Sequence, residues 1–348
     1  MPANLIIFFV TLRNMNKINV YIISLVLMVS ACSRPQHTTK HNPFTTEICL
    51  KTTPVKDQGH SSLCWVYAML ATIETNHLMQ GDSVNLSTDY VARCLLTETT
   101  RRYYFSRGAV PANLRGMGTR LLTLIQTYGV VPFDSYHAQD PVNYNVVARK
   151  LQLCTRPTTD FPGLDDRMNR VLDAAIGYLP GPKVHMLGAE YTPLEFAHSV
   201  CRDDEYQAIT SFTHHPFGSR FILEVPDNVN DDRVLNVPLD TMMHFIVSRI
   251  RSGRAVFWEG DVSSSGFHAN SGIAKLAQKH VTQQQRQRAF ERRETTDDHA
   301  LELIGLAHDR QGRRYFIAKN SWGTACGFGG FFYLSEDYVR MNTILVIG

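Results

Sequence analysis

A change in residue pattern near residue 205 constrains the fold more than any other feature of the chain. Before it, apolar residues recur every three or four positions, which predicts helices. These helices are expected over 64–79, 88–96, 121–128 and 161–178. After it, short β-branched and aromatic runs between turn residues predict strands. The strands are expected over 208–212, 219–225, 255–259, 300–306, 315–318 and 330–334, with a helix over 239–252. Helices followed by strands favour two lobes of an α+β protein over a repeating βαβ sheet.

Composition excludes two broad classes of protein. Of the 348 residues, 44% are hydrophobic and 19% are charged, so the chain has too much apolar surface to remain disordered. A net charge of +3 gives no strong field for binding nucleic acid. The segment 274–293 is rich in Gln and Arg but contains one aromatic residue, Phe290, so it is interpreted as a solvated helix or loop.

The first 31 residues have the layout of a secretory signal. They contain no acidic residue, and Arg13 and Lys17 are their basic residues. The apolar run 20–29 is too short to span a bilayer and ends in small residues. Met15 offers an alternative start, because a chain beginning there would also have a normal signal.

The sequence Val29-Ser30-Ala31-Cys32 is similar to a bacterial lipobox, in which lipid is joined to the cysteine after cleavage. We therefore expect an exported protein anchored by a lipid on Cys32 to a bacterial membrane, on its periplasmic or cell-surface side. The alternative is an ordinary signal peptide with an incidental cysteine. The polar residues 32–45 are then a tether.

Two segments carry residues suited to nucleophilic chemistry. In the first, Cys64 begins a predicted helix, where unpaired N–H groups and the helix dipole would stabilise a thiolate. Ser61 and Ser62 could cap this helix. Gln58 lies six residues upstream, where its amide could donate to an oxyanion together with the Cys64 N–H group.

The second segment supplies an imidazole and an amide. His299 stands near a predicted strand start, and Asn320 follows 21 residues later. An Asn that binds the far ring nitrogen would hold the tautomer and rotation of the imidazole. The indole of Trp322 would shield that hydrogen bond from water.

The order of Gln58, Cys64-Trp65, His299 and Asn320-Ser-Trp322-Gly resembles the papain-like cysteine peptidase pattern, and more narrowly its bleomycin hydrolase or aminopeptidase C branch. Supporting pieces are found at 128–132, 191–196, 255–261 and 333–339. The resemblance covers roughly residues 50–340. It implies a mainly helical lobe over 46–200 with the nucleophile helix and a mainly β-barrel lobe over 201–348 with the His and Asn.

The resemblance also implies roles for these residues in a peptidase that needs no cofactor. Cys64 would be the nucleophile, His299 the general base and acid, Asn320 the orienting residue and Gln58 part of the oxyanion hole, supported by Trp65 and Trp322. Peptides or proteins would be the substrates. The natural substrate and the oligomeric state stay open.

The chain departs from the family pattern at several positions. Ser62 replaces a Gly that usually stands two residues before the nucleophile, which could crowd the loop, and Ser61 replaces a Cys of papain itself. The glycine pair that lines the second substrate subsite is represented by Gly116, Met117 and Gly118. Bleomycin hydrolases have a C-terminal arm that enters the cleft and makes them aminopeptidases. The apolar run 343–347 is instead expected to be a barrel strand, which leaves aminopeptidase or endopeptidase action open.

Alternative functions are a catalytically inactive surface module of the same fold and a transglutaminase-like acyl transferase. The filled catalytic positions argue against the first, and an Asn in place of the usual orienting Asp argues against the second. No metal site is expected, because His214 and His215 have no Cys, Asp or Glu at ligand spacing. Asp297 and Asp298 are interpreted as solvated loop charges.

Seven cysteines are present. Apart from Cys32 and Cys64 there are five, an odd number, so they cannot all pair within one chain. Their pairing cannot be assigned from sequence. They are Cys49, Cys94, Cys154, Cys201 and Cys326.

Overall fold

The structure, a computed structural model, describes residues 42–156, 160–186 and 188–348. The predicted signal 1–31, the lipidation site Cys32 and most of the predicted tether lie outside the described residues. Within the described part of the chain, no helix is both long enough and apolar enough to cross a membrane.

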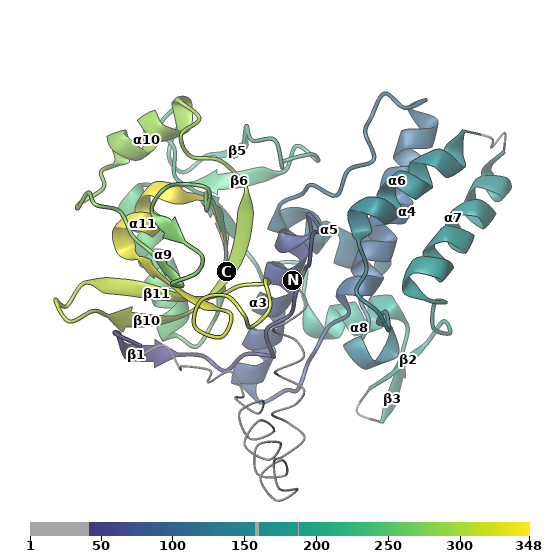
Figure 1. The fold of residues 1–348 in the computed structure, drawn as a ribbon, viewed down its shortest axis with the longest axis horizontal. Coiled ribbons are helices and arrows are strands. Elements are labelled where there is room, and N and C mark those ends of the chain that lie inside the picture. The colour runs from purple at the N-terminus through teal and green to yellow at the C-terminus, as the bar shows by residue number, and fades with distance from the viewer. Residues whose placement is uncertain (1–41, 157–159, 187) are drawn as a thin grey trace, which may run out of the picture. The chain divides into compact units, whose positions relative to one another are not determined.

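Helix α3 (Cys64–Gln80) lies between a group of helices and a group of strands (Figure 1). It is buried along most of its length, from Trp65 to Asn76, because its apolar residues occur on all sides rather than on one face. The other helices of the first lobe are α4 (Thr88–Phe105), α5 (Gly118–Tyr128), α6 (Tyr144–Thr155), α7 (Phe161–Ile176) and α8 (Pro193–Val200), with a 3₁₀ turn η1 (Phe133–Ser135) and a small hairpin of β2 (Val184–Met186) and β3 (Ala189–Tyr191).

The second lobe is built on an 11-stranded sheet formed by described residues. Its strands follow the order β5-β6-β4-β13-β7-β10-β11-β12-β9-β8, and β1 also pairs with β10. The strands are β1 (Thr45–Cys49), β4 (Ala208–Thr210), β5 (Arg220–Ile222), β6 (Arg233–Asn236), β7 (Val256–Gly260), β8 (Phe267–His268), β9 (Ile273–Ala274), β10 (His299–His308), β11 (Arg314–Lys319), β12 (Phe331–Ser335) and β13 (Thr343–Ile347). Helices α9 (Leu239–Arg251), α10 (Gln283–Glu291) and α11 (Glu336–Asn342) pack with these strands.

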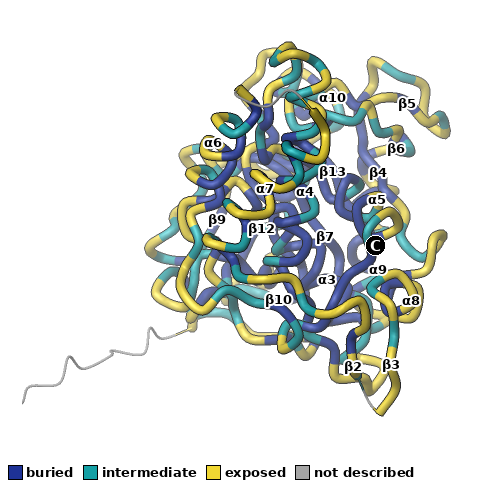
Figure 2. The backbone as a smooth tube through the Cα atoms, turned by 90° about the vertical axis from the view of Figure 1, so that its right-hand side faces the viewer, coloured by how far each residue is buried: buried dark blue, intermediate teal, exposed yellow. Residues whose placement is uncertain are grey.

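Strand β7 has one face toward each of two cores. Val256 and Trp258 belong to the core of the strand lobe, whereas Phe257 belongs to the core shared with the helices. Because side chains alternate along a strand, Glu259 points to the same side as Phe257, toward the helical lobe. Figure 2 shows buried segments of α3, β7 and β13 at the centre of the fold.

The α+β class and the change from helices to strands are confirmed. Helix α4 extends nine residues beyond its predicted end, and the run 343–347 forms β13 as predicted. Strand β1 was not predicted. It begins in the expected tether and pairs with β10, so residues 46–49, expected in the helical lobe, belong to the sheet. Phe44 anchors this segment by stacking on Tyr333 at 4.2 Å between ring centroids.

The Gln- and Arg-rich segment is only partly solvated. It forms α10, and the Arg286 side chain is fully buried there. Its guanidinium donates to the carbonyls of Ser211, Arg340 and Met341. The side-chain stem and these acceptors explain why a residue that looks solvent-directed in the sequence is buried.

Candidate active site

Cys64 is the first residue of α3 and is half-buried. The residue before it, Leu63, provides no side-chain cap. The predicted serine cap is therefore wrong: Ser61 donates instead to the Gln58 carbonyl at 2.7 Å, which closes the loop before the helix. Ser62 is exposed, so its side chain does not crowd the thiol.

His299 and Asn320 come from adjacent strands of the sheet. His299 opens β10 and Asn320 directly follows β11, so the antiparallel pair brings them together. The imidazole Nε2 and Asn320 Oδ1 are 2.8 Å apart. Oδ1 also accepts from the Ser321 N–H, which fixes it as an acceptor. Nε2 therefore carries the proton, and Nδ1 is left to accept one.

The Trp322 indole lies against the imidazole, with ring centroids 4.6 Å apart. This is the position predicted for a shield over the bond between His299 and Asn320. His299 and Asn320 are both buried, so water has little access to that bond. Sheltering strengthens the hydrogen bond because the surroundings have a low dielectric constant.

The amide of Gln58 is oriented by a residue whose role was not foreseen. Ser321 Oγ donates to Gln58 Oε1 at 2.6 Å, which places the Gln58 NH₂ group on the other side. Nε2 donates one hydrogen to the Ser61 carbonyl at 2.8 Å and has a second to give. The backbone of Gln58 also donates to the Ser321 carbonyl. Ser321 stands next to Asn320, so one turn orients both the imidazole and the amide.

Burial raises the pKa of the Cys64 thiol to about 12, and the carboxylate of Glu259 adds to this rise. The backbone N–H groups of Ala300 and Trp65 oppose it by hydrogen bonding to the sulfur. Burial also lowers the pKa of His299 to about 4, against the effect of Asn320. Both shifts favour a neutral thiol beside a neutral imidazole at pH 7. The thiolate predicted from the helix N-terminus alone is therefore outweighed by burial.

The residues predicted to line a substrate subsite are held by packing. A Cβ on Gly116 would lie 2.8 Å from the Trp65 ring, and one on Gly118 would lie 2.7 Å from Ile347. Met117 is 1% exposed, so its side chain belongs to the core rather than to a cleft surface. Trp65 donates to the Leu114 carbonyl at 3.0 Å and so fixes this loop beside α3.

An acidic group lies beside the thiol. Asp297 is buried and accepts from the Asp227 N–H at 2.6 Å, so interpreting it as a solvated charge was wrong; Asp298 is exposed as expected. Burial raises the pKa of Asp227 to about 6, and the charge of Asp297 contributes. Glu259 is also buried. No local pattern in the sequence indicates that Asp227, Glu259 and Asp297 form one group, because they lie on three separate segments.

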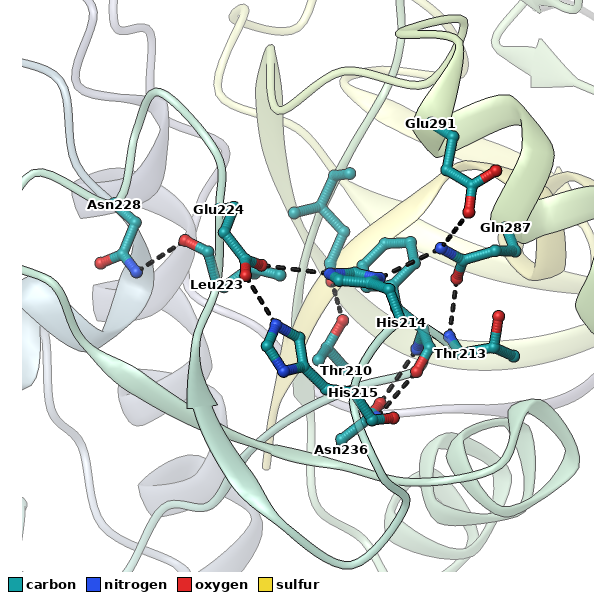
Figure 3. A network of polar contacts seen from close by, with 12 residues as sticks. Thr210, Thr213, His214, His215, Leu223, Glu224, Asn228, Asn236, Gln287 and Glu291 are labelled. Atoms are coloured by element: carbon teal, nitrogen blue, oxygen red, sulfur yellow. Dashed lines mark hydrogen bonds and ion pairs between the residues drawn. The ribbon is translucent and has the colours of Figure 1, made fainter.

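The two adjacent histidines have a carboxylate partner that the sequence analysis missed. His214 Nε2 and His215 Nε2 lie 3.2 and 2.6 Å from the two oxygens of Glu224 (Figure 3). Glu224 was overlooked because it is nine and ten residues away along the chain, and β5 returns it to the pair. The three side chains lie within the spacing of a metal site.

A hydrogen bond to His214 opposes metal binding at this cluster. Gln287 Oε1 accepts from the Thr213 N–H, so its Nε2 faces His214 Nδ1 at 3.1 Å (Figure 3). Nδ1 is thus the acceptor, and the proton of a neutral ring lies on Nε2. Nε2 then donates to Glu224 and has no lone pair for a metal.

Two further features lie outside the thiol site. A hollow of about 1080 Å³ borders α9, α10 and α11 and includes none of the predicted catalytic residues. Four of the five unassigned cysteines are free thiols, namely Cys49, Cys94, Cys201 and Cys326.

Comparisons with known proteins identify peptidases as the similar proteins. The model of the Peptidase C1-like family matches residues 182–347. Aminopeptidase E of Lactobacillus helveticus is 22% identical over 85% of this chain and 80% of its own length. Aminopeptidase G of Lactobacillus delbrueckii subsp. lactis is 24% identical over 85% of this chain and 80% of its own. Yeast mitochondrial cysteine proteinase 1 is 21% identical over 85% of this chain and 74% of its own.

A solved structure has the same fold. PepW from Lactobacillus rhamnosis HN001 superposes with a TM-score of 0.65 at 18% identity, covering 100% of this chain and 91% of that chain. The family match, the relatives and the fold agree on the same class of enzyme. With the Peptidase C1-like match in its second half and cysteine aminopeptidases among its relatives, the chain is a papain-like cysteine peptidase.

Proposed function

We propose that this cysteine peptidase is an aminopeptidase, which releases residues from the N-terminus of peptides. One observation supports this most directly. Arg115 of the helical lobe forms an ion pair with Asp227 of the strand lobe, and Thr119 Oγ1 donates to Asp232 at 2.5 Å. We call these four residues the lobe bridge. Arg115 directly precedes Gly116, in the segment that the family resemblance assigns to the second subsite.

The lobe bridge would restrict which substrates fit. A peptide that continues beyond the scissile residue toward its own N-terminus would have to pass the ion pair, whereas a peptide whose first residue occupies the site would not. The relatives are named aminopeptidases E, G and W, which favours the same activity. An endopeptidase remains the alternative if the bridge opens readily.

The chemistry assigned to the site is acyl transfer to sulfur. As Cys64 Sγ attacks the substrate carbonyl, His299 Nδ1 takes the thiol proton, and the S–C bond forms. The second hydrogen of Gln58 Nε2 and the Cys64 N–H would bind the developing oxyanion. His299 then gives its proton to the leaving amine as the C–N bond breaks. Water, deprotonated by His299, hydrolyses the thioester and releases the acid and the thiol.

The proposal is tested with one peptide in two forms. Full-length enzyme is incubated with a decapeptide that has a free or an acetylated N-terminus, and products are followed by mass spectrometry. An aminopeptidase shortens the free form from its N-terminus and leaves the acetylated form intact. Equal cleavage of both forms at internal bonds would contradict aminopeptidase action while retaining peptidase activity.

The same sample separates an enzyme from an inactive module of the same fold. A peptidyl epoxide should label the protein at Cys64 and leave the Cys64→Ala variant unlabelled. Absence of labelling in folded, reduced protein would contradict the assignment of Cys64 as the nucleophile.

We also propose export and lipid anchoring through Cys32. The support is the signal-like segment 1–31 and the small residues before Cys32. In cells fed an alkynyl fatty acid, the wild-type protein should carry the label and partition with membranes, and Cys32→Ala should do neither. Labelling of the variant would contradict lipid attachment at this cysteine.

A further inference from the structure

Glu259 is a buried acid on the side of β7 that faces the helical lobe. Its side chain is 2% exposed, and its neighbours in register are Ala300 on β10 and Leu345 on β13. Ala300 follows His299, and its N–H group hydrogen-bonds to Cys64. Glu259 also acts on the thiol more strongly than any other charged group. It therefore lies beside the reacting atoms rather than inside the barrel.

Neither carboxylate oxygen of Glu259 has a hydrogen-bond partner of ordinary geometry among the described residues. The backbone N–H of Gly118 at the start of α5 favours the charged form, but burial and the neighbouring acids outweigh it. The described residues also form no ion pair with Glu259. A buried carboxylate without partners is expensive, since burial removes its hydration without replacement. Such a group in a native protein calls for an explanation.

The surroundings of Glu259 are acidic. Asp227 and Asp297 both act on it to favour its protonated form. Arg115 is a cation that acts on Asp227 and Asp297, and it is engaged with Asp227 at the lobe bridge. The fold thus gathers three acids beside the thiol and provides one partly exposed guanidinium for them.

The close fit around Gly118 shows how the acid is held in place. A Cβ on Gly118 would lie 2.7 Å from Ile347 and 2.9 Å from Phe257. The absence of that Cβ lets the first turn of α5 approach β7 and β13. The helix start, with its positive end, then faces the acid.

We propose that Glu259 binds a cationic nitrogen of the peptide substrate next to the scissile bond. The cation is either the α-ammonium of an N-terminal residue or the side chain of a Lys or Arg. An α-nitrogen is two bonds from the carbonyl carbon that the thiol attacks, so it arrives beside Cys64 with the substrate. A bound cation would replace the hydration that Glu259 has lost. Glu259 is then a specificity-determining residue of the peptidase, and the α-ammonium arm rests on the proposed aminopeptidase function.

The experiment compares two pairs of coumarin substrates with the full-length enzyme. The first pair is phenylalanyl-aminomethylcoumarin and its analogue 3-phenylpropanoyl-aminomethylcoumarin, which lacks the α-ammonium. The second is acetyl-lysyl- and acetyl-norleucyl-aminomethylcoumarin, which differ in the side-chain cation. The kcat/KM ratio within each pair is measured for wild type, Glu259→Gln, Glu259→Asp and the distant control Glu224→Gln. A ratio is independent of the fraction of folded enzyme, so partial misfolding does not obscure it.

Wild type should prefer the cationic member of at least one pair by about 10- to 100-fold, as expected for a charged hydrogen bond. Glu259→Gln should lose most of that preference, Glu259→Asp should retain part of it, and Glu224→Gln should keep all of it. The proposal is overturned if Glu259→Gln keeps the wild-type ratios or if wild type has no preference in either pair. A Glu259-dependent preference for lysine alone would support this proposal and contradict the aminopeptidase function.

Discussion

Glu259 and Glu302 are two buried glutamates on adjacent strands of one sheet, and they differ in the charges around them. Their exposures are 2% and 0%, and neither makes a hydrogen bond of ordinary geometry. Glu302 stands opposite Lys319 in register, and the Lys319 Nζ lies 3.5 Å from its carboxylate. Glu259 has no such cation among the residues that the structure describes, and the charges of Asp227 and Asp297 act on it.

The neighbourhood of Glu302 is a balanced network. Lys319 also donates to Thr53 at 3.0 Å, and Thr53 donates to Glu74 of α3. Lys56 pairs with Glu74 at 2.8 Å. Two cations and two acids thus join α3 to the strands that hold His299 and Asn320. The two acids therefore differ in their partners. The fold provides a cation for Glu302, whereas we propose that a ligand provides one for Glu259.

Removing the cation from Glu302 should have the largest effect on stability. Lys319→Met leaves a buried carboxylate uncompensated, so we expect a loss of about 3–5 kcal/mol in the free energy of unfolding. Urea denaturation followed by tryptophan fluorescence measures it. The double variant Lys319→Met, Glu302→Gln should recover most of the loss. Equal stability of the single and double variants would mean that the ion pair does not explain the burial of Glu302.

Removing the charge of Glu259 should instead stabilise the protein. Burial and the acidic neighbours raise the pKa of Glu259 well above 4.5. The folded state therefore holds a proton that the unfolded state releases above pH 4.5, and wild-type stability falls as pH rises. Glu259→Gln should therefore be more stable than wild type at pH 7, by on the order of 1 kcal/mol or more.

The gain from Glu259→Gln should shrink toward zero as the pH falls below 4.5, where the acid becomes protonated in both states. Urea denaturation at pH 4.5 and pH 7 measures the difference between variant and wild type. His299, Asp227 and Asp297 titrate in both proteins, so their contributions largely cancel. A variant that is less stable than wild type at pH 7 would indicate a partner for Glu259 within the folded chain. Glu259→Gln should thus raise stability and remove substrate preference, because residues that serve function often reduce stability.

The sequence predicted the parts of the site that lie in continuous motifs. Cys64 begins a helix expected over 64–79, and His299 and Asn320 lie at strand ends, because local periodicity and turn residues determine such elements. The role of Ser321 was missed, although it is adjacent to Asn320. Its bond joins segments 263 residues apart, which no local pattern reveals.

The electrostatics could not be predicted from the same motifs. A helix N-terminus favours a thiolate, but burial and Glu259 raise the pKa of Cys64. Asp227 reaches the site through the segment between β5 and β6, and Glu259 lies in a strand whose sequence looks apolar. Which face of a strand is turned toward another lobe depends on tertiary packing. The reacting groups are therefore easier to identify from the sequence than the neighbouring groups that determine their protonation.

Opening the lobe bridge should have a small effect on stability and a measurable one on specificity. Arg115 is about half exposed, so Arg115→Ala should cost no more than about 1 kcal/mol. If the bridge blocks longer substrates, the variant should cleave the acetylated decapeptide, which wild type leaves intact, with little change on the free form. Thr119→Val tests the second contact of the bridge. Unchanged rates on the acetylated peptide in both variants would mean that the bridge does not limit access.

Of the three glutamates, Glu224 should give the smallest change in the free energy of unfolding when its charge is removed. This acid is 51% exposed, and each of its oxygens already has an imidazole partner (Figure 3). Slight burial raises its pKa, but the hydrogen bonds from His215 and His214 outweigh that and lower it. The stability it provides is therefore present above pH 4.5 and lost as pH falls through its folded-state pKa. Exposure to solvent limits that contribution, so Glu224→Gln should change the free energy of unfolding at pH 7 by less than about 1 kcal/mol.

The cluster of His214, His215 and Glu224 also tests whether an acid that already has hydrogen-bond partners can bind a ligand. Because Gln287 holds the His214 proton on Nε2, added zinc should not raise the melting temperature of wild type more than that of Glu224→Gln. If zinc raises the melting temperature of wild type and Glu224→Gln abolishes that rise, the Gln287 amide can rotate by about 180°. Hydrogen-bond partners would then not prevent Glu224 from binding a metal. The difference between Glu224 and Glu259 would then be explained by burial alone. An acid with partners at the surface could exchange them for a metal, whereas a buried acid among acids holds a proton until a cation enters with the substrate.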